Sequence, residues 1–230
     1  MLSQNSDTSK ERIYKKLRSS IILNAIKPGE RLQLDELAAQ YSTSVTPVRE
    51  ALQMLVQEGL VENKPHAGFY AAQVTLKQLR DMLEMREILE IAAVERAVKR
   101  ITAEQIEALE KVHVGYAGDD DTERERYLYE NKRFHYLIAL ASGNQMLADT
   151  LQHLHDRLAR FLVFVHTGDE IEKRHQRLID ALRTHNTELA KQTILNEVNE
   201  TCQITLEHIT QEDGAVWLVG ASSVEGESLP

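Results

Sequence analysis

The strongest constraint on the fold lies at residues 42–56, where a junction rich in hydroxyl side chains precedes a periodic apolar stripe. Thr43, Ser44 or Thr46 can cap a helix there, and Pro47 is tolerated because first-turn amides have no partner within the helix. Apolar side chains then recur at the spacing of one helix face: Val48, Ala51, Leu52, Leu55 and Val56. A short amphipathic helix at 34–41 precedes the junction, so we expect a helix-turn-helix.

A turn-and-strand signal follows the second of these helices. Gly59 is well placed to end the helix, and Leu60-Val61 and Phe69-Tyr70 are typical of two short strands. The segment 64–68, Lys-Pro-His-Ala-Gly, would join the strands as a wing. The sequence therefore predicts a winged helix-turn-helix.

The start of the second helix also carries groups that bind nucleic acid. Ser44, Thr46 and Arg49 lie off the apolar stripe. Hydroxyls and free helix amides bind phosphates, and a guanidinium can read a guanine edge. The alternative is an ordinary capped helix in a small helical subdomain, and the wing with its Gly68 favours DNA binding over it.

This segment resembles the DNA-binding domain of the GntR family of bacterial regulators. The resemblance rests on TPVREAL at 46–52, on PGERL and LDELA before it, and on EGLV with a Pro/Gly wing after it. It implies DNA contacts from the helix end and from a wing in the minor groove: Ser44, Thr46, Pro47, Arg49, Lys64, His66 and Gly68. In two departures from the family, Val45 stands where arginine is common and Ser42 where glycine is frequent.

Composition limits the cellular setting. The single cysteine, Cys202, allows no intramolecular disulfide. The chain has no apolar run long enough for a membrane span and no signal-peptide pattern at its start, so we expect a cytoplasmic protein without a membrane partner. The net charge is −9, but residues 1–73 carry 9 Lys and Arg against 8 Asp and Glu. The acidic excess therefore lies in the second half and does not oppose DNA binding.

Helical periodicity dominates from Leu76 onward. Six helices are expected, at about 76–100, 103–116, 122–141, 145–166, 169–183 and 187–209. Six helices with short loops predict an antiparallel bundle, so the chain as a whole is expected to be mainly α. The expected organisation is a flexible N-terminus (1–9), the winged domain (10–73), the bundle (74–210) and a flexible tail (211–230).

The bundle resembles the FCD ligand-binding domain of the FadR subfamily of GntR regulators. The matching segments are 85–90, 131–135, 141–144 and 174–182. The resemblance implies an effector and dimerisation domain that recognises small organic acids or related metabolites. Its candidate effector-binding residues here are Arg86, Asn131, His135 and His175.

Many FCD domains hold a divalent metal through an aspartate, a histidine four residues later and two further histidines. The matching positions here are Asn131, His135, His175 and Glu197, which would suit zinc, nickel or manganese. The alternative is that His135 and His175 are buried pocket residues that touch the effector directly. His155 is set aside, because it lies two residues from His153 and the two point to different faces.

Arg86 lies on the expected inner face of the first bundle helix, where its guanidinium could have either of two roles. A buried guanidinium needs a partner, and Glu90 is available one turn later. The functional alternative is a bidentate clamp on an effector carboxylate.

These patterns predict a homodimeric transcription regulator rather than an enzyme. It would bind double-stranded operator DNA, and its effector would change operator affinity, with repression the more common family behaviour. Two alternatives remain, a helical-bundle metalloenzyme using His135, His175 and Glu197 and a dimeric DNA-binding scaffold without effector. The enzyme is disfavoured because no nucleophile or phosphate loop accompanies those residues.

Overall fold

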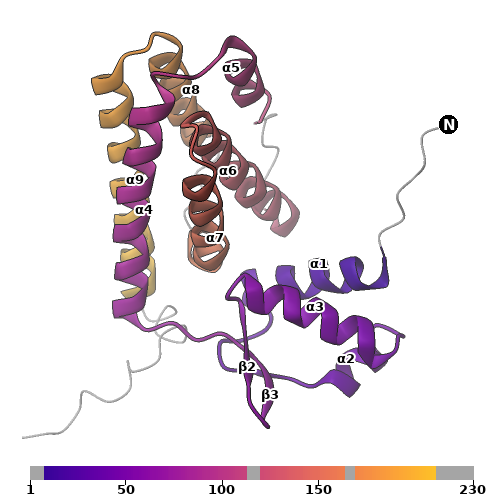
Figure 1. The fold of residues 1–230 in the computed structure, drawn as a ribbon. Coiled ribbons are helices and arrows are strands. Elements are labelled where there is room, and N and C mark those ends of the chain that lie inside the picture. Colours follow the sequence, from indigo (N-terminus) through magenta and orange to yellow (C-terminus); the bar gives the residue numbers. More distant parts are fainter. Residues whose placement is uncertain (1–7, 113–119, 164–168, 211–230) are drawn as a thin grey trace, which may run out of the picture. The chain divides into compact units, whose positions relative to one another are not determined.

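A computed structural model of the chain describes residues 8–112, 120–163 and 169–210. These residues form two compact units, and the chain passes from the first to the second between Thr75 and Leu76 (Figure 1). The expected tail at 211–230 lies outside the described residues. Within the described ranges, no helix combines the length and the apolar character needed to cross a bilayer.

The first unit contains three helices, α1 (Ser9–Ile22), α2 (Leu34–Gln40) and α3 (Val45–Gln57). The expected flexible N-terminus at 1–9 extends too far, because α1 already begins at Ser9. Thr8 caps this helix in a reciprocal capping box with Glu11, which satisfies amides at the helix start. The helices enclose a core of fully buried side chains, including Ile13, Leu17, Val48, Leu52 and Leu55.

Three short strands complete this unit: β1 (Arg31–Leu32), β2 (Val61–Lys64) and β3 (Gly68–Ala71). β3 lies in the middle of an antiparallel sheet, with the order β1-β3-β2. The pairing of Val61 with Ala71 and of Lys64 with Gly68 confirms the expected wing. β1 was not expected from the sequence, and it completes the sheet by pairing with β3.

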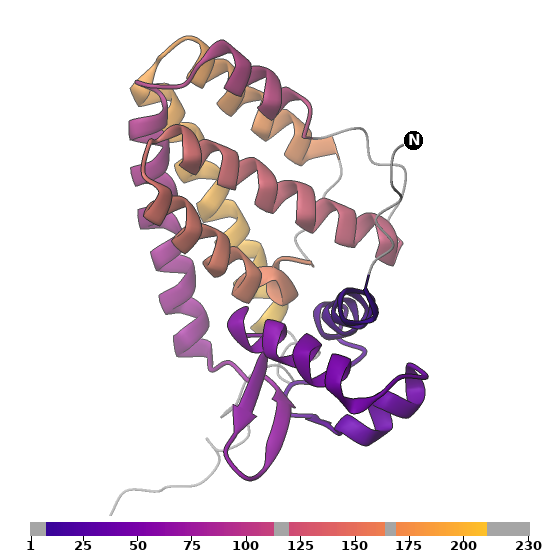
Figure 2. The ribbon, with the colours of Figure 1, turned by 45° about the vertical axis from the view of Figure 1, so that its right-hand side comes forward.

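The second unit is a bundle of six helices among the residues described: α4 (Leu76–Ala97), α5 (Ala103–Glu110), α6 (Asp121–Ala141), α7 (Gln145–Leu162), α8 (Asp169–Arg183) and α9 (Thr187–Thr210). α4 packs against α6, α7 and α9, and α8 packs against α9. Figures 1 and 2 show α4 and α9 side by side and running in opposite directions. α5 and α7 end earlier than expected, and the rest of their expected spans falls mostly within 113–119 and 164–168, outside the described residues.

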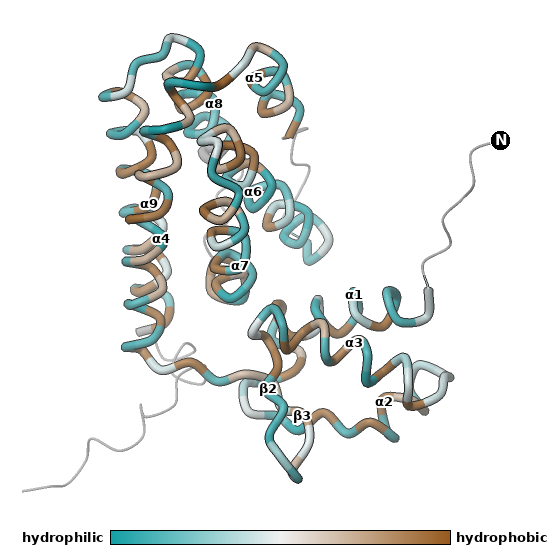
Figure 3. Tube along the Cα trace, viewed as in Figure 1, coloured by the Kyte–Doolittle hydropathy of each residue, from teal (hydrophilic) through white to brown (hydrophobic). Residues whose placement is uncertain are grey.

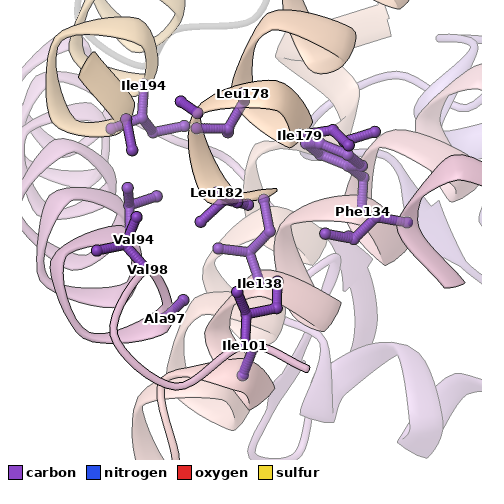
Figure 4. Packing of buried hydrophobic residues seen from close by; sticks show 14 of the residues in the cluster. Val94, Ala97, Val98, Ile101, Phe134, Ile138, Leu178, Ile179, Leu182 and Ile194 are labelled. Carbon is purple, nitrogen blue, oxygen red and sulfur yellow. The ribbon is translucent and has the colours of Figure 1, made fainter. Parts of the chain in front are cut away.

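Aliphatic side chains from α4, α5, α6, α8 and α9 pack together in one cluster of this bundle. Figure 4 shows Val94 of α4, Ile138 of α6, Leu178 and Leu182 of α8 and Ile194 of α9 packed together. Hydrophilic and hydrophobic stretches alternate along α4 (Figure 3). The alternation does not keep every polar group outside the bundle, because several charged side chains are buried further along α4, α6, α7, α8 and α9.

Candidate functional site

The first candidate site is the exposed start of α3. Ser44 is the N-cap residue, but its side chain makes no capping hydrogen bond. Ser44, Thr46 and Arg49 are exposed, as a surface that contacts DNA requires. Pro47 lies in the first turn, where the loss of its amide costs no intrahelical bond. The residues expected at the helix end are therefore together and accessible.

The turn before α3 keeps the conformation that glycine favours. Ser42 adopts φ 51° although it carries a side chain. This departure from the family therefore leaves the left-handed turn in place, with some backbone strain at Ser42.

The wing lies close to the same helix. A groove between them has a lining in which the cations Arg31, Arg49 and Lys64 outnumber one carboxylate, Asp35. His66 and Gly68 of the wing also line it. His66 lies at the wing turn with φ 61°, and the ammonium of Lys64 lies 4.7 Å from the centre of the Tyr70 ring. Arg31 was missed because only the pairing of β1 with β3 brings it beside the wing.

The second candidate site is a cluster of buried polar side chains inside the bundle. α4 supplies Arg86 and Glu90, α6 supplies Asn131 and His135, and α7, α8 and α9 each supply one residue. Those three are His155, His175 and Glu197. Each of the seven side chains is at most 5% exposed. Burial of this many ionisable groups is costly unless they bind one another or a ligand.

The His135 ring lies between two carboxylates. Its Nδ1 is 3.0 Å from Oε1 of Glu90, and its Nε2 is 3.0 Å from Oε1 of Glu197. Each of these two oxygens also meets a second imidazole. Nε2 of His175 lies 3.4 Å from the Glu197 oxygen, and Nε2 of His155 lies 2.9 Å from the Glu90 oxygen.

The set formed by His135, His175 and Glu197 fits a divalent metal. One ligand atom from each residue lies within 4.8 Å of the others. Bonds of about 2.0–2.2 Å to a central ion place neighbouring ligand atoms roughly 3.0–3.5 Å apart, in agreement with the 3.0 and 3.4 Å contacts. Oε2 of Glu197 is buried without a hydrogen-bond partner. The three ligand atoms lie close enough together for a single ion to bind all of them.

The same contacts perturb the pKa values of the cluster. Burial alone would lower the pKa of His135, but Glu90 and Glu197 outweigh burial and raise it to about 9. Burial lowers the pKa of His155 to about 4, and it lowers that of His175 as well. Burial opposes ionisation of the two carboxyls, yet the histidines hold the pKa of each below its usual range.

A small cavity adjoins the Glu197 side of the cluster. Its volume is about 10 Å³, room for roughly one water molecule. Its lining consists of Arg86, Tyr127, Asn131, Leu162, Arg174, Glu197 and Thr201. Nε of Arg86 is 3.6 Å from Glu90, and Nη2 is 3.9 Å from Glu197. The expected pairing of Arg86 with Glu90 is therefore present. Because Nη1 of Arg86 is buried without a hydrogen-bond partner, the guanidinium can still bind an anion.

Sequence reasoning missed some residues of this site. Tyr127 lies four residues before Asn131, and Thr201 lies four after Glu197, so helical spacing could have placed both at the cavity. His155 was not expected at this site, but its side chain is buried and contacts Glu90. The side chain of His153 is exposed. The signal for His155 was its place on the buried stripe of Leu151, Leu158 and Leu162.

A basic winged helix-turn-helix joined to a helical domain with an internal polar cavity is the architecture of a transcription regulator. Comparison with known proteins agrees. Residues 9–71 match the bacterial regulatory proteins of the gntR family, and residues 81–199 match the FCD domain. The chain belongs to the GntR family and pairs its DNA-binding domain with an FCD effector-binding domain. It is a DNA-binding transcription regulator and not an enzyme.

Named relatives share this organisation. An uncharacterised HTH-type transcriptional regulator, YdhC of Bacillus subtilis, is 31% identical over 86% of this chain and 91% of its own length. The HTH-type transcriptional repressor RspR of Escherichia coli is 26% identical over 88% of this chain and 91% of its own length. The solved structure of E. coli McbR/YncC covers 88% of this chain and 99% of its own, with a TM-score of 0.67 and 24% identity.

Proposed function

We propose that this chain is a homodimeric repressor whose affinity for operator DNA is set by a small carboxylate-bearing effector bound beside a divalent metal. The observation that carries the proposal is the cavity between Arg86 and Glu197. It places a guanidinium, which binds carboxylates in bidentate fashion, next to the metal-ligand set. The cavity has room for about one water molecule, so the helices that line it would have to move apart to admit an effector. The effector would then meet both positive charge and polar side chains.

His135, His175 and Glu197 would hold the metal, which would be zinc, nickel or manganese. When bound, it would supply a Lewis-acidic position for an effector oxygen. Asn131 lines the cavity beside Glu197, where its amide oxygen can accept a hydrogen bond or serve as a neutral ligand. Arg86 and Arg174 would orient the effector anion, and the Tyr127 and Thr201 hydroxyls would form hydrogen bonds to its other polar groups.

Control of repression by an effector requires linkage between the bundle and the DNA-binding domain. An effector changes operator affinity only if it binds more tightly to one arrangement of the protein than to another. The cavity is lined by α4, which starts directly after the winged domain in the chain, and by α6, α7, α8 and α9. A ligand that moves these helices apart can therefore change the direction in which α4 leaves the domain.

An exposed apolar groove supports the homodimer. The groove lies between α4 and α7, and Met82, Met85, Leu89 and Leu154 supply its apolar lining. Met85 is 46% exposed, and Ile88, three residues further along α4, is 52% exposed. A second copy that covers this face would bury apolar surface and present two recognition helices to a two-fold operator.

The proposal is tested on full-length protein without an affinity tag. Metal analysis should find one divalent ion per chain in the wild type and much less in His175→Ala. A screen of small carboxylic acids by thermal shift should yield a stabilising ligand that releases operator DNA, and Arg86→Ala should weaken its binding. Operator DNA itself is identified by selecting bound genomic fragments. A wild type without metal that no acid stabilises would contradict the proposal and favour a scaffold without effector.

A further inference from the structure

We propose that Glu90 and His155 form a positioning pair that orients the metal ligand His135 and links it to Arg86 of the effector cavity. This inference rests on the proposed metal site at His135, His175 and Glu197. The pair comes from α4 and α7 and meets His135 at Nδ1, whereas the metal set meets the ring at Nε2.

The geometry assigns the two nitrogens of His135 to different tasks. A neutral imidazole carries a proton on one nitrogen and a lone pair on the other. Glu90 is fully buried with Oε1 3.0 Å from Nδ1, so its carboxylate favours the tautomer with the proton on Nδ1. The lone pair of Nε2 then points to the side where His175 and Glu197 converge. Carboxylates that fix metal-bound histidines in this way increase metal affinity.

His155 holds Glu90 in turn. Its Nε2 is 2.9 Å from Oε1 of Glu90, in a buried hydrogen bond between residues 65 positions apart in the chain. The same Glu90 oxygen lies 3.0 Å from Nδ1 of His135. The bond from His155 therefore holds the carboxylate oxygen that the His135 ring meets.

The same three residues could be read as a second metal site, since one ligand atom each from Glu90, His135 and His155 also lies within 4.8 Å of the others. Two observations favour the positioning role. The His155 nitrogen already forms its hydrogen bond with Glu90. In addition, Glu90 does not line the effector cavity, whereas Glu197 does.

Arg86 extends the pair toward the effector. The guanidinium contacts Glu90 through Nε and Glu197 through Nη2, at 3.6 and 3.9 Å, and it lines the cavity. Glu90 thus contacts both the ring that would bind the metal and the cation that would bind the effector. Loss of its charge should weaken both ligands, whereas loss of His155 should act on the metal through Glu90.

The test compares full-length wild type, Glu90→Gln and His155→Gln with matched controls Glu87→Gln and His153→Gln, which change neighbouring residues on the same helices. Zn²⁺ affinity is measured by competition with a chromophoric chelator. We expect a 10- to 100-fold loss for Glu90→Gln, a smaller loss for His155→Gln and less than twofold for the controls. The visible absorption of Co²⁺-loaded protein should also change in Glu90→Gln, because the orientation of a ligand changes.

The outcomes separate this inference from the proposed site. A wild type that binds no Zn²⁺ overturns the site, and the inference falls with it. Wild-type binding of one equivalent with unchanged affinity and Co²⁺ spectrum in both variants overturns the inference alone, even where the variants are less stable. Two equivalents in the wild type, with one lost in His155→Gln, would make the pair a ligand set and also overturn it. If Glu90→Gln does not fold, His155→Gln carries the test.

Discussion

Glu90 and Glu197 show how single residues determine the chemistry of the bundle. Each carboxylate is buried, and each meets two imidazoles and one arm of Arg86 through a single oxygen. The second oxygen of each is buried without a hydrogen-bond partner. Such a cluster stabilises the fold less than packed hydrocarbon would. Buried charge at this cost is typical of a binding site.

At the DNA-binding end, Arg49→Ala should weaken specific operator binding by about 1–3 kcal/mol, because it removes a guanidinium that would contact a base or phosphate. Fluorescence anisotropy with labelled operator measures the change. Arg12→Ala is the control, since Arg12 is an exposed arginine on α1. A folded Arg49→Ala protein that binds with wild-type affinity would remove this residue from the interface.

His155 should make the metal-free protein sensitive to acid. Its pKa is about 4 in the folded protein and near 6.5 when unfolded, so the unfolded chain binds more protons between these values. The free energy of unfolding should therefore fall as the pH drops from 6.5 to 4, by up to about 1.4 kcal/mol per pH unit from this group. His135, with its raised pKa, contributes a loss only above pH 6.5.

Urea unfolding at a series of pH values checks this sign. His155→Gln should flatten the slope between pH 6.5 and 4, while His153→Gln should leave it as in the wild type. Equal slopes in wild type and His155→Gln would show that His155 is not held neutral by the fold.

At the scale of elements, a helix or strand could be predicted from the sequence where its cap and its apolar stripe lie within one segment of the chain. The α3 helix, the wing strands and α8 follow from such signals, and α8 spans the expected 169–183. β1 could not be predicted, since a strand of two residues exists only through its pairing with β3. The end of α5 was placed too late, because Lys111 already closes that helix as its C-cap.

The turn between α2 and α3 allows a prediction about strain. Ser42 is exposed and holds φ 51°, a conformation that costs a residue with a side chain about 1–2 kcal/mol. Ser42→Gly should relieve this strain, partly offset by the greater freedom of glycine in the unfolded chain, with a net gain of about 1 kcal/mol or less. Thermal unfolding measures it, and Ser42→Val should lower the midpoint. A less stable Ser42→Gly would mean that the serine hydroxyl matters more than the backbone.

At the scale of the molecule, the candidate site could be predicted only in part. Asn131, His135, His175 and Glu197 were found through resemblance, and the structure places the last three in one group. His155 was missed, because a distance of two residues from His153 says nothing about neighbours 20 residues earlier on α6. Which helices of a bundle face one another depends on packing along the whole chain.

The groove between α4 and α7 makes the last prediction, which concerns assembly. Met85→Glu with Ile88→Glu places two charges on an exposed apolar face, where a second copy would have to desolvate them. If the wild type is the proposed dimer, sedimentation of the double variant should show monomers. Affinity for a full two-fold operator should fall at least about 10-fold while affinity for one half-site is kept, because two linked heads bind through effective concentration.

Leu189→Glu is the matched control for this pair, since Leu189 is a similarly exposed apolar residue on α9 and does not line the groove. If the control also gives monomers, the dimer forms through another face. If the α4 variant remains a dimer, the groove serves some other contact. A monomer that still binds the full operator like the wild type would separate dimerisation from DNA recognition, and would contradict the two-fold operator on which repression depends here.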